Sequence, residues 1–368
     1  MPDPCTPEVR TPEVCTPEVC TPQFLSLEVG RQDVGAQKVG PVRLRCAVAG
    51  EGPLVLMVHG FPESWYSWRH QITPIAEAGY MACAIDVRGY GGSDSPFPVA
   101  CYDMETLVGD VVGVKQALSP HRPAVLIGHD WGAPIVWNSA LAHPQLFCAV
   151  AGLSVPYLGV PQRSFDDVMD EMFTRRGRFF YQVYFQERRA EIDLDADPRG
   201  FLRRFLYAIS GDAPAGSWPT NKTPAAKLTD GLIDPEPFPG WLSPVDLNVY
   251  VAQFERSGFR GGLNRYRNHR RDFDWLQAFK DRRIEQPSLM IAGDRDPAYA
   301  MLGGADPIPV MRRFAPNLQG VHILPGCGHW TQQERPAEVT CALLQWLSGL
   351  GFARAPAASV QAPFSQIR

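Results

Sequence analysis

The five-residue segment Gly128-His-Asp-Trp-Gly132 carries the side chain best suited to covalent chemistry. It lies directly between a strand-like apolar run and a helical pattern, so Asp130 is predicted to sit in a sharp turn that requires small neighbours. The start of the next helix favours a developing anion there. An aspartate is not a useful nucleophile for acyl transfer of the kind that serine hydrolases perform. It can displace a leaving group from an sp³ carbon and form an alkyl ester. The alternative is a buried Asp in an ordinary tight turn.

A second motif, His59-Gly-Phe-Pro62, also follows a strand-like run. A loop in this position can direct a backbone N–H toward the nucleophile. We therefore expect the N–H groups of Phe61 and Trp131 to form an oxyanion hole. Because the loop must fold back for this, the Phe61–Pro62 peptide bond is predicted to be cis. An ordinary Gly-Pro turn is the alternative interpretation.

A base and its partner acid are expected in the last third of the chain. His329 follows a predicted strand, and Asp296 follows the strand before it. The chain order Asp130, Asp296, His329 is a nucleophile–acid–base order, and all three residues follow strands. Asp294 competes with Asp296 for the acid role, and only one of them is expected to face His329.

These motifs lie within a regular alternation of strand and helix patterns. Short apolar runs predict strands at Val42–Ala49, Leu54–Val58, Met81–Ile85, Ala124–Ile127, Ser288–Ile291 and Gly320–Leu324. Helices are predicted at Gln71–Ala78, Thr106–Leu118, Ala133–Ala142, Met311–Phe314 and Pro336–Leu347. Such alternation predicts βαβ units in a mostly parallel, buried sheet, with ligands bound at the strand ends.

The alternation stops between residues 156 and 272, which predict an inserted, mainly helical cap with a Pro-rich loop. Its helical pieces are Phe165–Arg175, Phe179–Arg188, Pro198–Ile209 and Pro244–Ser257. The core is thereby divided into residues 24–155 and 273–350. Residues 1–23 contain a Thr-Pro-Glu-Val repeat and predict a disordered low-complexity tail. Residues 351–368 predict a loose C-terminal tail.

In these motifs the chain resembles the soluble epoxide hydrolases of the α/β-hydrolase superfamily. The resemblance spans about residues 24–350 and rests on His59-Gly-Phe-Pro-Glu-Ser-Trp65, Asp86-Val-Arg-Gly-Tyr-Gly-Gly-Ser93, Gly128-His-Asp-Trp-Gly132 and Gly328-His-Trp-Thr-Gln332. It implies the α/β-hydrolase fold, a mostly parallel central sheet flanked by helices with an inserted helical cap. Haloalkane and fluoroacetate dehalogenases share these motifs and the Asp nucleophile.

Two cap segments decide between these activities. Tyr181-Gln-Val-Tyr-Phe-Gln186 and residues 257–268 resemble the segments that supply two acid tyrosines in the epoxide hydrolases. Carried over, the acids are Tyr181 and Tyr266, with Tyr184 as the local alternative to Tyr181. An epoxide oxygen leaves as an alkoxide and needs an acid, whereas a halide needs N–H donors. The resemblance therefore favours hydrolysis of epoxides to vicinal diols over dehalogenation.

The implied mechanism has two steps and requires no metal or cofactor. Asp130 opens the epoxide to give a hydroxyalkyl ester, and His329, supported by Asp296, activates the water that hydrolyses this ester. The expected walls of the substrate pocket are Trp65, Tyr157 and Phe185. A non-catalytic ligand-binding protein with a hydrolase fold is the alternative from another class, and such a protein has no need of the full residue set.

The composition narrows the expected partners to small molecules. The chain has 35 basic and 39 acidic residues, and this net charge of −4 disfavours nucleic-acid binding. The apolar runs are too short for a transmembrane segment, and the N-terminus lacks a secretory signal pattern. Nine cysteines without metal-ligand spacing indicate reduced thiols in a cytoplasmic protein. We expect a monomer or homodimer that acts on a small hydrophobic epoxide and water.

Overall fold

The structure, a computed structural model, describes residues 20–30, 32–34, 37–39, 41–219, 221–300 and 306–351. The predictions for residues 1–19 and 352–368 fall outside this described part. Cys20 is buried and disulfide-bonded, so the prediction of reduced thiols is wrong at this residue. Five other described cysteines, Cys46, Cys83, Cys101, Cys148 and Cys327, are free thiols.

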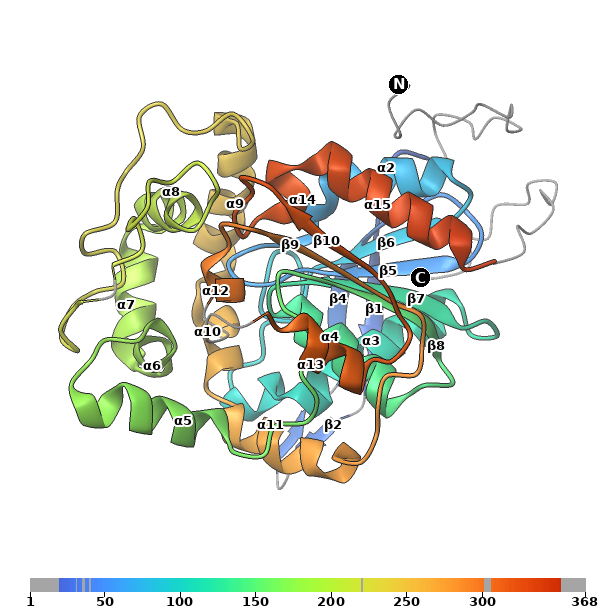
Figure 1. Cartoon of the computed structure of the whole chain (residues 1–368), viewed down its shortest axis with the longest axis horizontal. Coiled ribbons are helices and arrows are strands. Elements are labelled where there is room, and N and C mark those ends of the chain that lie inside the picture. Colours follow the sequence, from blue (N-terminus) through green and yellow to red (C-terminus); the bar gives the residue numbers. More distant parts are fainter. Residues whose placement is uncertain are drawn as a thin grey trace.

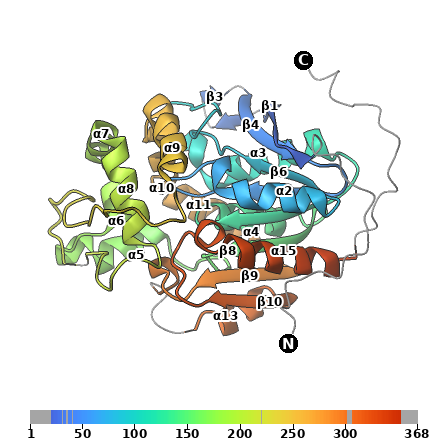
Figure 2. The ribbon, with the colours of Figure 1, turned by 90° about the horizontal axis from the view of Figure 1, so that it is seen from above.

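An eight-stranded sheet forms the centre of the molecule (Figures 1 and 2). In spatial order its strands are β1 (Gln23–Val29), β4 (Val42–Ala49), β6 (Met81–Ile85), β5 (Leu54–Val58), β7 (Ala124–His129), β8 (Phe147–Leu153), β9 (Ser288–Gly293) and β10 (Leu318–Leu324). The pairings β1–β4 and β4–β6 are antiparallel, and the others are parallel. A separate antiparallel pair consists of β2 (Gln32–Val34) and β3 (Gln37–Val39). The predicted mostly parallel sheet is therefore confirmed.

Helices cover both faces of this sheet, because side chains point alternately to the two sides of each strand. Leu56 of β5 joins one apolar core with α3 and α4, whereas its neighbour Met57 joins a second core with α2 and α15. These helices are α2 (Arg69–Glu77), α3 (Met104–Leu118), α4 (Gly132–Ala142) and α15 (Pro336–Gly349). The two cores hold the sheet and thereby fix the loops at its strand ends.

The chain leaves the sheet after β8 and returns to it in β9. The described residues between these strands form helices and turns: α5 (Phe165–Met172), α6 (Tyr181–Gln186), α7 (Arg188–Ala196), α8 (Pro198–Ala208), α9 (Pro244–Ser257), α10 (Arg260–Tyr266) and α11 (His269–Leu276). Figure 1 shows α5 to α8 beside the sheet, with α9 and α10 between them and the core. This is the predicted inserted helical cap.

The remaining elements are short. They are the 3₁₀ helices η1 (Trp65–Trp68), η2 (Val99–Tyr102), η3 (Thr174–Arg176) and η4 (Gln277–Phe279) and the helices α12 (Pro297–Ala300), α13 (Ile308–Phe314) and α14 (Thr331–Glu334). None of the helices in the described part of the chain has the length and apolar character needed to cross a membrane.

Candidate active site

Asp130 occupies a sharp turn between β7 and α4. Its φ of 51° lies in the left-handed region, which residues with a side chain seldom adopt. A Cβ atom at Gly128 would lie 2.2 Å from the carbonyl oxygen of Gly132, and one at Gly132 would lie 2.0 Å from the carbonyl oxygen of Val58. Glycine at both positions therefore permits the turn, which places the Asp130 carboxylate at the start of α4, where the helix dipole favours negative charge.

The loop after β5 supplies a donor to this carboxylate. The backbone N–H of Phe61 donates to Oδ1 of Asp130 at a distance of 2.8 Å. The Phe61–Pro62 peptide bond is cis, as predicted. Trp131 follows Asp130 as the N-cap residue of α4. The Phe61 N–H thus lies where the predicted oxyanion hole requires a donor.

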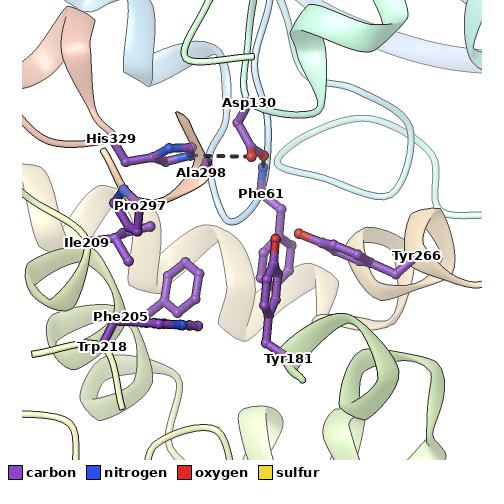
Figure 3. A pocket seen from close by; sticks show the side chains of 10 residues that line it. All are labelled: Phe61, Asp130, Tyr181, Phe205, Ile209, Trp218, Tyr266, Pro297, Ala298 and His329. Atoms are coloured by element: carbon purple, nitrogen blue, oxygen red, sulfur yellow. Dashed lines mark hydrogen bonds and ion pairs between the residues drawn. The ribbon is translucent and has the colours of Figure 1, made fainter. Parts of the chain in front are cut away.

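His329 lies between two carboxylates. Its Nε2 atom is 3.3 Å from Oδ2 of Asp130 (Figure 3), and its Nδ1 atom is 2.9 Å from Oδ1 of Asp296. Burial alone would lower the pKa of His329, but the charges of both carboxylates and their hydrogen bonds raise it well above its usual value. Burial would raise the pKa of Asp296, yet its contacts with His329 lower it. These directions describe an imidazolium held by two carboxylates.

Of the two candidate acids, Asp296 faces the imidazole and Asp294 does not. Asp294 is exposed, and its Oδ1 accepts a hydrogen bond from the N–H of Gly326 at 2.7 Å. The backbone of His329 is also fixed, because its carbonyl oxygen accepts from the Ser154 hydroxyl at 2.9 Å and from Nε2 of His129 at 2.7 Å. His329 therefore has little freedom to turn away from Asp130.

Tyr181 on α6 and Tyr266 on α10 approach Asp130 from the cap, and both hydroxyls point toward it (Figure 3). Their ring centroids are 6.3 Å apart. Burial, and then the negative charge of Asp130, raise the pKa of both tyrosines above the usual value. Both hydroxyls are therefore protonated at neutral pH and can donate a proton. Tyr184 differs, because its hydroxyl donates to Asp193 at 2.9 Å.

A cavity lies between Asp130 and the cap (Figure 3). Apart from Asp130 and His329 its walls are uncharged and largely aromatic, which suits a small apolar ligand. The lining residues are Phe61, Asp130, Tyr181, Phe205, Ile209, Trp218, Tyr266, Pro297, Ala298 and His329. The cavity thus brings the predicted nucleophile, base and two acids together around one volume.

The three predicted pocket walls lie outside this lining. Trp65 turns toward β1 and packs edge-on against Phe24, with 5.0 Å between ring centroids. Tyr157 packs near Trp137 on α4, with 6.2 Å between centroids. Phe185 lies one helical turn along α6 and packs against the rings of both cap tyrosines rather than facing the cavity. Aromatic character alone does not tell which of these rings is directed toward a ligand.

Comparison with known proteins gives a consistent assignment. A family model described as alpha/beta hydrolase fold matches residues 53–232. "Epoxide hydrolase A" of Mycobacterium tuberculosis is 43% identical over 319 residues, which cover 84% of this chain and 95% of that protein. The chain belongs to the epoxide hydrolases. "Epoxide hydrolase B" of the same species is 37% identical over 332 residues, covering 82% of this chain and 92% of that protein.

Solved epoxide hydrolases share the whole architecture. The structure of an epoxide hydrolase from an endophytic Streptomyces has a TM-score of 0.82 and 42% identity, covering 90% of this chain and 96% of that chain. Epoxide hydrolase A from Mycobacterium thermoresistibile gives 0.81 and 39%, covering 90% of this chain and 100% of that chain. The predicted family, enzyme class and fold are therefore confirmed.

Sequence reasoning missed five residues that line the cavity of this epoxide hydrolase. They are Phe205, Ile209, Trp218, Pro297 and Ala298. The last two directly follow Asp296, so the acid motif itself was the signal that could have found them. Phe205 and Ile209 are four residues apart at the end of α8 and lie on the same side of the helix. The spacing of apolar residues does not tell what that side of the helix faces. Trp218 comes from the Pro-rich loop, which has no readable period.

A buried ion pair between Glu63 and His129 contacts the backbone of His329 in this epoxide hydrolase. Oε2 of Glu63 accepts from Nδ1 of His129 at 2.7 Å, and Oε1 accepts from the side chains of Gln332 and Gln333 at 3.2 and 3.1 Å. Burial would raise the pKa of Glu63, but the His129 charge and hydrogen bond lower it to about 2. Because the other nitrogen of His129 donates to the His329 carbonyl, the pair connects the loop after β5 with the loop that carries the base.

Proposed function

We propose that this epoxide hydrolase converts small apolar epoxides and water into vicinal diols through a hydroxyalkyl ester of Asp130. The observation that carries the proposal is the arrangement around the nucleophile. His329 contacts one oxygen of the Asp130 carboxylate, while the hydroxyls of Tyr181 and Tyr266 face the same carboxylate from the cap. An epoxide placed between them meets a nucleophile at carbon and two acids at oxygen.

In the first step an oxygen of Asp130 attacks the less hindered epoxide carbon, and the strained C–O bond breaks. A cap tyrosine transfers its proton to the leaving alkoxide. The product is a neutral ester, so the negative charge beside Nε2 of His329 disappears. Because that charge helps to raise the pKa of His329, ester formation lowers the pKa again. His329 can then return its proton to the tyrosinate and become a neutral base.

In the second step the neutral His329 takes a proton from water, and the hydroxide attacks the carbonyl carbon of the ester. The N–H groups of Phe61 and Trp131 stabilise the oxyanion. Collapse of the intermediate breaks its bond to the substrate oxygen, and the departing alkoxide takes the proton of the hydroxyl group added from water. The diol is thereby released, the Asp130 carboxylate is regenerated and the other water proton stays on His329. The cycle consumes one epoxide and one water, and every catalytic group returns to its starting form.

The test is to separate the two steps. In a His329→Gln variant, Asp130 remains anionic and should still open styrene oxide, but the ester should not be hydrolysed. Mass spectrometry should find one substrate mass on the peptide that contains Asp130. Asp130→Asn should carry no adduct at early times. An unmodified, folded His329→Gln protein would instead indicate direct attack by water on the epoxide.

The same assay addresses the second candidate chemistry, dehalogenation by the same nucleophile. Halide release from chloro- or fluoro-alkanes, without diol formation from epoxides, would favour that candidate. The two protonated tyrosines favour epoxide opening, because a departing halide needs no proton.

We also propose that the enzyme is cytoplasmic and functions as a monomer or homodimer. The buried thiols of Cys46 and Cys83 interact on adjacent strands and yet are unpaired, which suits a reducing compartment. Cys20 is the exception. Cell fractionation and analytical ultracentrifugation would test the two statements, and an exported or tetrameric protein would contradict them.

A further inference from the structure

The two cap tyrosines are held in different ways. Helix α10, which carries Tyr266, rests directly on the core: a Cβ atom at Gly261 would lie 2.4 Å from the Cα atom of Gly89, in the loop after β6. The side chain of Arg265 donates to the carbonyl of Tyr102 at 2.9 Å. Backbone contact without intervening side chains leaves little room for movement, so the core itself fixes Tyr266.

Helix α6, which carries Tyr181, has no comparable polar attachment to the core. Among the described residues, the hydrogen bonds and ion pairs found for side chains of α6 and α7 end on other cap residues. Figures 1 and 2 both show α10 between these two helices and the central sheet. Phe185 of α6 also packs against Phe61 of the core, with 5.2 Å between ring centroids, so it is the polar contacts of Tyr181's helix that reach the core through α10.

Glu191 on α7 forms two ion pairs with arginines at the ends of α10. One of its oxygens, Oε2, accepts from Nε of Arg260 at 3.1 Å, and the other pairs with Arg267. Arg260 begins α10 and Arg267 follows its last residue, so one carboxylate contacts both ends of the helix. Glu191 is only 8% exposed. Burial would raise the pKa of Glu191, but the two arginines lower it, which indicates a charged carboxylate.

Two further residues also connect α6 and α7 to α10. Asp195, one helical turn after Glu191, accepts from the N–H of Phe259 at 2.9 Å and so caps the start of α10. Gln186, the last residue of α6, donates to the carbonyl oxygen of Tyr266 at 3.2 Å. The segment from Tyr181 to Asp195 therefore contacts α10 just before its first residue, at its first and last residues, and just beyond its end.

We infer that Glu191 is a positioning residue for epoxide opening, because it holds α7 against both ends of α10 and so sets the distance of the Tyr181 hydroxyl from Tyr266 and Asp130. The inference rests on the proposed role of the tyrosines as acids. It assigns Glu191 to the first step alone, since the residues proposed for ester hydrolysis belong to the core.

The test measures both steps in single-turnover rapid-quench experiments with styrene oxide. Glu191→Gln should lower the rate constant for ester formation about 10-fold or more, because a small misplacement of an acid costs this much. Ester hydrolysis should stay within about twofold of the parent enzyme, because its groups are not displaced. The control is Glu187→Gln, the same change four residues earlier, where the carboxylate is exposed and pairs with Arg189. It should leave both rate constants unchanged.

A double-mutant cycle distinguishes positioning from general loosening. Added to Tyr181→Phe, Glu191→Gln should have little further effect on ester formation, because the group it positions is already absent. Added to Tyr266→Phe, it should retain its full effect. If Glu191→Gln does not fold, Arg260→Gln removes one of the two contacts and should give a smaller loss of the same kind.

Three results would overturn the inference: equal losses in both steps, an undiminished effect in the Tyr181→Phe background, or unchanged ester formation in a folded variant. A parent enzyme that forms no ester on Asp130 would instead refute the proposed mechanism, whatever the behaviour of Glu191.

Discussion

The imidazole of His329 connects two carboxylates that differ in their access to the cavity. The side chain of Asp130 is 18% exposed, whereas that of Asp296 is 0% exposed. Both lie within hydrogen-bonding or ion-pairing distance of the same ring, yet only Asp130 lines the cavity. A ligand in the cavity can therefore contact the carboxylate of Asp130, whereas the carboxylate of Asp296 stays bonded to His329 away from the cavity.

This difference predicts the behaviour of the two aspartates after β9. Asp296→Asn should slow ester hydrolysis by about 10²-fold or more and accumulate the Asp130 ester, because the imidazolium loses its buried counter-charge. Asp294→Asn is the matched control and should change turnover little, since Asp294 is exposed and bonds the N–H of Gly326. Single-turnover kinetics of the two variants would check this. Equal effects of the two substitutions would contradict the assignment of Asp296 as the acid.

The tyrosines should share the acid role. Tyr181→Phe and Tyr266→Phe should each slow ester formation, and the double variant should lose about 10²–10⁴-fold, the usual contribution of general acid catalysis. Tyr184→Phe should be nearly silent in this step, because the Tyr184 hydroxyl is occupied by Asp193. Stopped-flow measurement of ester formation decides the matter. A larger loss in Tyr184→Phe than in Tyr181→Phe would move the acid by one helical turn.

Trp218 should limit the size of the epoxide. Its ring packs edge-on against Tyr181 and Phe205, with centroids 5.7 and 5.8 Å away, and it lines the cavity. Trp218→Ala should raise kcat/KM for bulky aryl glycidyl ethers relative to styrene oxide by about 10-fold, because added apolar groups then find space. Trp241→Ala, in the same loop but outside the lining, should leave that ratio unchanged. A ratio that is the same in both variants would remove Trp218 from the determinants of size.

Glu63 should make stability depend on pH. Its pKa is about 2 in the folded chain against an ordinary value of 4.5, so its carboxylate stabilises the fold fully above about pH 4.5. This contribution, about 3 kcal/mol, is lost as the pH falls from there to about 2. Glu63→Gln should therefore lower the free energy of unfolding near pH 7, with a difference from the parent that shrinks toward pH 3.

Denaturant unfolding between pH 3 and 7 would measure this difference, with Glu51→Gln as the exposed control. A gap between Glu63→Gln and the parent that is constant over this range would show that the Glu63 charge does not contribute to the pH dependence.

The sequence was most informative where local sterics and chemistry act together. Gly128 and Gly132 permit the turn at Asp130, so this motif predicted the observed backbone, while the role of Asp130 as nucleophile stays a prediction. The pattern also predicted β5, β6 and β4 at their observed bounds. It missed β8, because Phe147-Cys-Ala-Val-Ala-Gly-Leu153 consists largely of small residues with little strand preference.

The cap was harder to predict. The predicted helix at Phe179–Arg188 is divided into α6 and α7 at Glu187, whose extended backbone interrupts the helical run. The acid pair followed from family resemblance rather than from periodicity. The pocket walls were predicted wrongly because Trp65, Tyr157 and Phe185 find aromatic partners in the packed structure, and sequence alone does not distinguish such partners from a ligand.

The place of the cap in the chain has a consequence for how such enzymes diversify. β8 and β9 are adjacent parallel strands, and the N–H of Ser154, just after β8, donates to the carbonyl of Ile291 in β9 at 2.8 Å. The polypeptide thus leaves the sheet at the carboxyl end of β8 and returns to it at the amino end of the adjacent strand β9. A longer, shorter or foreign cap inserted between these two strands need not change the register of the sheet, so new substrate ranges are accessible by exchange of one contiguous segment while the core residues of the cavity are retained.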